Sequence, residues 1–153
     1  MTERRFATAA AIISFAIERE IAAAEGYAWI AGRAKTPGLR ELAEDLRGQE
    51  IEHRRLLEGL PAETLRRLGA SPVPDLRLVD ALAAEALSEE MSIQDMLVFA
   101  AKKEAQSIAL YESLARLAGP SEEDRLFEFL AGEERKHKLR LEAEYETHIL
   151  QEN

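Results

Sequence analysis

The sequence contains no cysteine, and only eight glycines and five prolines occur among its 153 residues. The absence of cysteine excludes disulfide bonds, thiolate-held zinc and iron–sulfur clusters within this chain. It is compatible with the cytoplasm, where we expect the protein. Aromatic residues make up only 6% of the chain, and runs of strand-forming residues are almost absent. The first prediction is therefore an all-α fold.

Long apolar segments and basic clusters are missing as well. No apolar run reaches the roughly 20 residues needed to cross a membrane. The apolar stretch at 6–17 runs into the charged residues 18–20 without a convincing cleavage site, so we interpret it as the start of a helix. The net charge of −9 argues against nucleic acid as a partner, because phosphate binding needs clustered Lys and Arg. We expect a protein with neither a membrane nor a nucleic-acid partner.

Helix-breaking residues divide the rest of the chain into long helical segments. The composition, 46% hydrophobic and 32% charged, is that of a helical protein. Pro61 interrupts the second segment, and a further turn or two is expected through Leu68. The crossover at about 69–91 begins with a Gly- and Pro-containing cluster and leaves room for a short helix at about 78–87. The predicted helices are at about 2–34, 37–60, 92–118 and 121–150, forming two hairpins of one four-helix bundle domain spanning 1–153.

Capping signals support these boundaries. Thr36 followed by Pro37 is typical of an N-cap and the first helical position. Ser92 with Asp95 predicts a capping box at the start of the third long helix, and residues 121–124 repeat the pattern at the fourth.

An internal repeat relates the two hairpins. Shifting the sequence by 84 residues aligns the first hairpin with the second without a gap. The alignment matches histidines, tyrosines and glycines that chance would not readily place in register. We infer a pseudo-two-fold axis between the hairpins. The clearest matches are Phe15 with Phe99, Glu20 with Glu104, Tyr27 with Tyr111, Leu46 with Leu130, Gly48 with Gly132, Glu50 with Glu134 and His53 with His137.

Each half carries a glutamate, a tyrosine seven residues later, and a Glu-x-x-His motif in the next helix. Residues i and i+3 share a helix face, so Glu50 with His53, and Glu134 with His137, can point at one place. Glu20 and Glu104 lie about as far from the turn of their hairpin as these motifs do. All six side chains can therefore meet at one level of the bundle.

Apolar neighbours indicate that this face points inward. Four carboxylates in a core would repel one another at a cost of several kcal/mol each unless a cation were present. Two divalent ions would compensate the charge, and oxygen with imidazole ligands suits iron or manganese better than calcium or magnesium. A single Glu-x-x-His is usually a solvated face, but two copies in register, each with a partner glutamate, match the inward ligands of di-iron and di-manganese bundles.

The remaining candidates leave alternatives open. Tyr27 and Tyr111 either pack in the core or hydrogen-bond a metal-bound carboxylate. Gly48 and Gly132, unusual inside helices, either permit close helix approach or leave room beside the metals. His148 and the glutamates at 18, 25, 52 and 133 fall off the metal-facing stripe, and we expect them at the surface.

At these residues the sequence resembles the rubrerythrin-like branch of the ferritin-like superfamily. The resemblance rests on Glu20, Glu50-Ile-Glu-His53, Glu104 and Glu134-Arg-Lys-His137, with Tyr27 and Tyr111 at the family's usual places. It implies a ferritin-like bundle with a non-haem di-iron centre, bridged by Glu50 and Glu134. Glu20 and Glu104 would be terminal ligands, with one histidine on each iron.

Two departures bear on the reaction. Rubrerythrins carry a second glutamate three residues after the third-helix ligand, where this chain has Ser107, and they commonly append a rubredoxin domain, which this chain lacks. The six-ligand set is closer to the ferroxidase centre of bacterioferritin-like proteins. Electrons would then come from an external donor or from ferrous iron itself.

Four functions remain as hypotheses. The leading one is an oxidoreductase whose catalytic set is Glu20, Glu50, Glu104 and Glu134 with the two tyrosines, oxidising ferrous iron or reducing dioxygen or hydrogen peroxide. The alternatives are an iron-storage or iron-handling protein with a ferroxidase site as its port, a di-manganese catalase-like protein, and a metal-free interaction module. A homodimer is expected from the size of the bundle.

Overall fold

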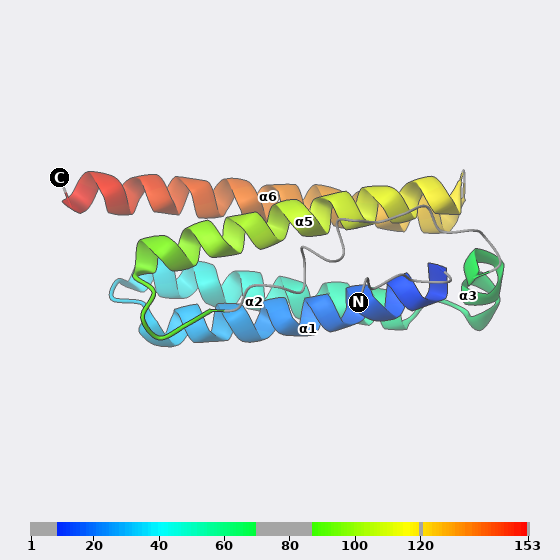
Figure 1. Ribbon diagram of the computed structural model, residues 1–153, viewed down its shortest axis with the longest axis horizontal. Helices are drawn as coiled ribbons and strands as arrows, with labels where there is room; N and C mark the ends of the chain where they lie inside the picture. Colours follow the sequence, from blue (N-terminus) through cyan, green and yellow to red (C-terminus); the bar gives the residue numbers. More distant parts are fainter. Residues whose placement is uncertain (1–8, 70–86, 120, 153) are drawn as a thin grey trace, which may run out of the picture.

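The computed structural model describes residues 9–69, 87–119 and 121–152, and all regular structure in these ranges is helical. Helices α1 and α2 form one antiparallel hairpin, α5 and α6 form the other, and the two hairpins lie side by side (Figure 1). This arrangement confirms the prediction of an all-α four-helix bundle. The short helix expected at 78–87 lies almost entirely outside the described residues. The helices are α1 (Ala9–Arg33), α2 (Pro37–Glu58), α3 (Ala62–Gly69), α5 (Ile93–Ala118) and α6 (Glu122–Glu152).

The capping residues determine where the long helices begin. The Thr36 hydroxyl accepts a hydrogen bond from the Leu39 backbone N–H at 3.2 Å, with Pro37 at the first helical position. Ser92 and Asp95 form the predicted capping box, each side chain accepting from the backbone N–H of the other. These contacts satisfy donors that have no partner within their own helix.

Helix α3 closes one end of the bundle (Figure 1). It forms the additional turns expected after Pro61 and contacts α1. It is also tied to the start of α6, because Glu123 accepts a hydrogen bond from Thr64 at 2.7 Å and pairs with Arg67 at 2.8 Å. The end of the first hairpin is thereby fixed against the second.

The apolar core consists of two clusters, one on each side of the middle of the bundle. One contains Ile12, Ala16, Tyr111, Leu114 and Leu130 among others, and the second contains Met96, Ala100, Tyr27, Ile30 and Leu46. Each member of the first list lies 84 residues from its counterpart in the second, so the internal repeat exchanges the two clusters. Burying a Leu or Ile side chain contributes roughly 1.5–3 kcal/mol, so these clusters hold the middle layer in place.

None of the described helices is long and apolar enough to span a lipid bilayer.

Candidate metal centre

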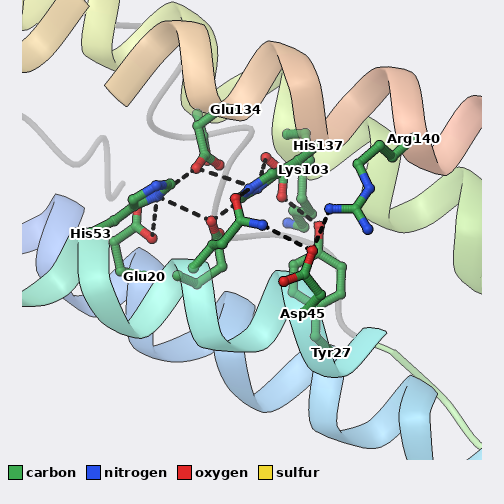
Figure 2. Close-up of polar contacts among 12 residues, drawn as sticks. Glu20, Tyr27, Asp45, His53, Lys103, Glu134, His137 and Arg140 are labelled. Carbon is green, nitrogen blue, oxygen red and sulfur yellow. Dashed lines mark hydrogen bonds and ion pairs between the residues drawn. The ribbon is translucent and has the colours of Figure 1, made fainter. Parts of the chain in front are cut away.

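The layer between the two apolar clusters is polar, and the structure brings all six predicted side chains into it. Glu20 and Glu104 come from α1 and α5, while the two Glu-x-x-His motifs come from α2 and α6. Figure 2 shows His53, Glu20, Glu134 and His137 converging between these helices. Six charged or polar residues in a core require compensation. Their exposed fractions are Glu20 3%, Glu50 1%, His53 3%, Glu104 2%, Glu134 0% and His137 1%.

The two half-sites interlock. His53 Nδ1 lies 2.9 Å from Oε1 of Glu134 on the other hairpin, and His137 Nδ1 lies 3.1 Å from Oε1 of Glu50. The imidazole rings are stacked, with centroids 5.6 Å apart and planes inclined by 10°. Ligand atoms of these four residues all lie within 4.8 Å of one another.

Glu20 and Glu104 complete the set from α1 and α5. Glu20 Oε2 is 3.6 Å from His53 Nδ1, and Glu104 Oε2 is 3.7 Å from His137 Nδ1. Each histidine therefore faces one glutamate of α1 or α5 through the same nitrogen that faces Glu50 and Glu134. The geometry groups the residues as two equivalent halves, as the repeat predicted.

Every one of the six residues has at least one buried atom without a hydrogen bond among the described residues. These atoms are Glu20 Oε2, Glu50 Oε1, His53 Nδ1, Glu104 Oε2, both Glu134 oxygens and His137 Nδ1. Buried polar atoms are nearly always satisfied, so six unsatisfied residues around one point indicate a missing partner. Oxygen and imidazole donors that share negative charge suit divalent transition-metal ions. The cluster is compatible with a di-iron site.

Both tyrosines contact the cluster, and each does so across the hairpins. Tyr27 donates a hydrogen bond to Glu104 Oε1 at 2.5 Å, and Tyr111 donates one to Glu20 Oε1. Burial, together with the neighbouring carboxylates, raises the pKa of both phenols well above the usual value, so both remain donors. Each phenol therefore hydrogen-bonds a carboxylate of the cluster, and its role beside a metal-bound carboxylate stays a prediction. The phenols also pack in the core.

Comparison with known proteins gives the same grouping. The sequence matches the Rubrerythrin family over residues 11–145. This chain belongs to the rubrerythrin family. The solved structure of a hypothetical protein from Pyrococcus furiosus is similar, with 29% identity and a TM-score of 0.67, over 88% of this chain and 86% of that one. No curated protein matches significantly.

In this rubrerythrin-family chain, the charges of the cluster shift its pKa values. Burial alone would lower the pKa of His53, but Glu20 and Glu50 raise it to about 10. His137 follows the same balance, and its pKa rises to about 9 through Glu104 and Glu50. Without metal, both imidazoles therefore carry a proton at neutral pH and partly compensate the carboxylates.

The pKa values of Glu20, Glu50 and Glu134 do not all shift in the same direction. Burial, reinforced by repulsion from other glutamates, raises the pKa of Glu20 and of Glu134. Burial would raise the pKa of Glu50 too, but the two nearby histidines lower it. The cluster thus holds extra protons that a bound cation would have to displace.

One ligand is held from outside by residues that the sequence pattern did not single out. Gln49 Oε1 lies 2.8 Å from His137 Nε2, and the Gln49 amide nitrogen donates to Asp45 Oδ2 at 3.0 Å. Arg140 of α6 pairs with the same oxygen of Asp45 at 2.5 Å (Figure 2). In the sequence, Gln49 lies four residues before His53, and this spacing is too common in helices to have identified Gln49 as part of the site.

The position where rubrerythrins carry an additional glutamate is also occupied differently. Ser107 is buried, and its hydroxyl accepts a hydrogen bond from the Arg19 guanidinium at 3.1 Å. Arg19 also donates to the backbone oxygen of Lys103 at 3.2 Å. The hydroxyl of Ser107, with the Arg19 guanidinium beside it, thus stands where a fifth carboxylate would be.

The remaining polar candidates lie off the cluster, as expected. Glu18, Glu25 and Glu52 are exposed, and Glu133 pairs with Lys136 at 3.1 Å. His148 is half-buried rather than fully at the surface, and it pairs with Glu144 at 3.3 Å, on its own helix.

Proposed function

We propose that this chain is a non-haem di-iron oxidoreductase that oxidises ferrous iron or reduces dioxygen or hydrogen peroxide. The six proposed ligands supply two metal positions, each with one histidine and one terminal glutamate, and share two bridging carboxylates. The ligands are Glu20, Glu50, His53, Glu104, Glu134 and His137.

The observation that carries the proposal is the set of unsatisfied atoms directed at one point. Each of the six side chains keeps an oxygen or nitrogen without a hydrogen bond. A purely structural polar layer would pair these atoms with one another in good geometry. Without metal, the buried negative charge is reduced by protons on the two histidines, Glu20 and Glu134 and by the nearby Arg19 guanidinium, whereas two divalent cations would neutralise the four carboxylates directly.

The protein's own residues would control how this centre reacts. Two iron ions held here would supply one electron each to an oxidant. Tyr27 and Tyr111 hold one oxygen of each terminal glutamate, which directs the other oxygen toward the centre. The apolar clusters flank the layer on both sides along the bundle.

The source of electrons follows from what the chain contains. The sequence has no cysteine to hold a second redox centre, so we propose that electrons come from an external donor or from ferrous iron arriving as substrate. Manganese stays the alternative metal, and metal analysis of protein from its own source distinguishes the two. A cytoplasmic location and a homodimer also stay proposals, and light scattering tests the second.

Rapid mixing tests the function directly. The protein is loaded anaerobically with two ferrous ions per chain and mixed separately with dioxygen and with hydrogen peroxide. We expect ferric absorbance to form faster than in free ferrous iron under the same conditions, and Glu134→Ala to abolish the difference. If neither oxidant reacted faster with the protein than with free iron, the redox function would be wrong.

A further inference from the structure

The internal repeat breaks down at one place beside the centre. On the α2–α6 face, His137 is covered by Gln49 and by the ion pair between Asp45 and Arg140. Adding or subtracting 84 gives the counterparts around His53. They are Glu133 for Gln49, Phe129 for Asp45 and Leu56 for Arg140.

These counterparts cannot form the same cover. Leu56 and Phe129 carry no charge, so no ion pair spans the helices at this end. Glu133 pairs with Lys136 of its own helix. The Nε2 atom of His53, which corresponds to the atom held by Gln49, has no hydrogen-bond partner among the described residues. One half of the centre is covered and the other is not.

An open pocket of about 550 Å³ lies beside the uncovered half, and Asp45 and Gln49 of the cover over His137 form part of its wall. Its rim reaches solvent, since Glu44, Gly48, Glu52 and Phe129 are all exposed. Its inner wall includes His53, which is only 3% exposed and belongs to the proposed metal centre. The pocket therefore connects solvent with one metal position. It is lined by Glu44, Asp45, Gly48, Gln49, Glu52, His53, Leu56, Phe129 and Glu133.

The charge of this pocket selects the kind of species that enters. Four of its lining residues are carboxylates, and none of the described lining residues is Lys or Arg. Asp45, Glu52 and Glu133 each have one cationic partner outside the lining. A concave, acidic surface concentrates small cations and repels anions.

We propose that divalent cations reach the centre through this pocket, so that the position beside His53 fills first and the position beside His137 fills more slowly behind Gln49. The proposal rests on the proposed function, because it needs the six residues to bind metal. It predicts that metal ions exchange faster at the position beside His53 than at the position beside His137, although the repeat makes the two halves otherwise alike.

Gly48 is the feature of the wall that best fits this role. A glycine inside a helix costs about 1 kcal/mol relative to alanine. A Cβ atom at Gly48 would meet nothing within 4 Å, so close helix approach does not explain it. Gly132, its counterpart on α6, is equally free of neighbours but does not line the pocket. The pair offers a matched test of whether the space at Gly48 is used.

The experiment follows the loading of cobalt(II), a redox-stable probe, into metal-free protein by stopped-flow absorbance, with calorimetry for the number of ions bound. We expect two phases in the wild type, one for each position. Gly48→Phe should slow the first phase about tenfold, with two ions still bound at equilibrium. Gly132→Phe should leave the first phase unchanged.

Two further variants keep the test informative if Gly48→Phe does not fold. Glu52→Gln should slow loading about threefold at low salt and weaken its dependence on ionic strength. Glu58→Gln is its control, since Glu58 is likewise exposed and paired with an arginine of α2 but lies outside the pocket. Arg140→Leu, which introduces the residue found at Leu56, should accelerate the second phase.

The outcomes separate the two proposals. Two bound ions with loading rates unchanged in Gly48→Phe and Glu52→Gln would overturn the access route alone. Equal slowing by Gly132→Phe and Gly48→Phe would also overturn it. Failure of the wild type to bind two ions would overturn the metal centre and, with it, this route.

Discussion

At the scale of single residues, the amide of Gln49 determines which nitrogen of His137 is free for a metal. Its NH₂ group donates to Asp45, so its oxygen must face His137 and accept from Nε2–H. That leaves Nδ1, which points into the cluster, with a free lone pair once the histidine is neutral. The series of contacts from Arg140 through Asp45 and Gln49 thus favours the tautomer of His137 with its proton on Nε2.

Replacing this amide should weaken one metal position and spare the other. We expect Gln49→Leu to lower the affinity for one of two cobalt ions by about tenfold, because an unsupported imidazole binds metal less well. Calorimetric titration measures both affinities. Glu133 at the equivalent position pairs with Lys136 and not with a proposed ligand, so Glu133→Leu should leave both affinities unchanged. Equal losses in the two variants would contradict the tautomer argument.

Arg19 acts on the same layer through charge. Burial lowers its pKa, but Glu104 and Glu20 oppose this, so the guanidinium remains a cation beside the ligands. Removing that charge in Arg19→Met should strengthen cobalt binding about tenfold, since a neighbouring cation repels a divalent ion. The metal-free variant should at the same time lose roughly 1–3 kcal/mol of stability through its lost hydrogen bonds. Arg19→Lys is the control that keeps the charge, and tighter binding in it would contradict the electrostatic reason.

At the scale of elements, Gly132 and Gly119 illustrate two uses of glycine. Gly119 ends α5 with a φ of +65°, which side chains rarely adopt, whereas Gly132 is in ordinary helical backbone within α6. Gly132→Ala should raise the free energy of unfolding of the metal-free protein by about 1 kcal/mol. Gly119→Ala should lower it, because the left-handed conformation penalises a Cβ. Urea denaturation measures both, and destabilisation by Gly132→Ala would show that its site needs the space.

Helical spacing explains how much the sequence could predict. Glu50 and His53 share a face at i and i+3, and the 84-residue shift repeats that pattern at Glu134 and His137. Glu20 and Glu104 were added because they lie about as far from the turn of their hairpin as these motifs do. The contacts of Tyr27 and Gln49 depend on how α5 and α6 lie against the first hairpin. Such contacts depend on rotamers and helix packing across the bundle, which no spacing within one helix encodes.

At the scale of the whole molecule, the polar layer makes stability depend on what fills it. Two apolar clusters are held apart by six buried ionisable side chains, and without metal the repulsion among these side chains is reduced by bound protons and by the nearby Arg19 guanidinium. Metal and protons therefore compete for the same atoms. Folding stability, metal affinity and pH are linked through this one layer.

The linkage gives a prediction with a definite sign. The raised pKa values of His53, about 10, and His137, about 9, stabilise the metal-free fold fully below the unfolded value of 6.5. This stabilisation is lost progressively as the pH rises from 6.5 to between 9 and 10. Glu20, with its pKa raised to about 7, adds a loss between 4.5 and 7. The metal-free melting temperature should therefore fall between about pH 6 and pH 9.

Bound metal should reverse this trend. Because a cation replaces the protons, the stabilisation by cobalt should grow with pH over the same range, reaching about 4 kcal/mol at a thousandfold excess over the dissociation constant. Thermal melts with cobalt and with chelator, at matched pH values, measure the difference. His148→Gln removes the histidine outside the layer and should change neither curve. A metal effect that shrank as the pH rose would mean that the ions bind somewhere other than at these six residues.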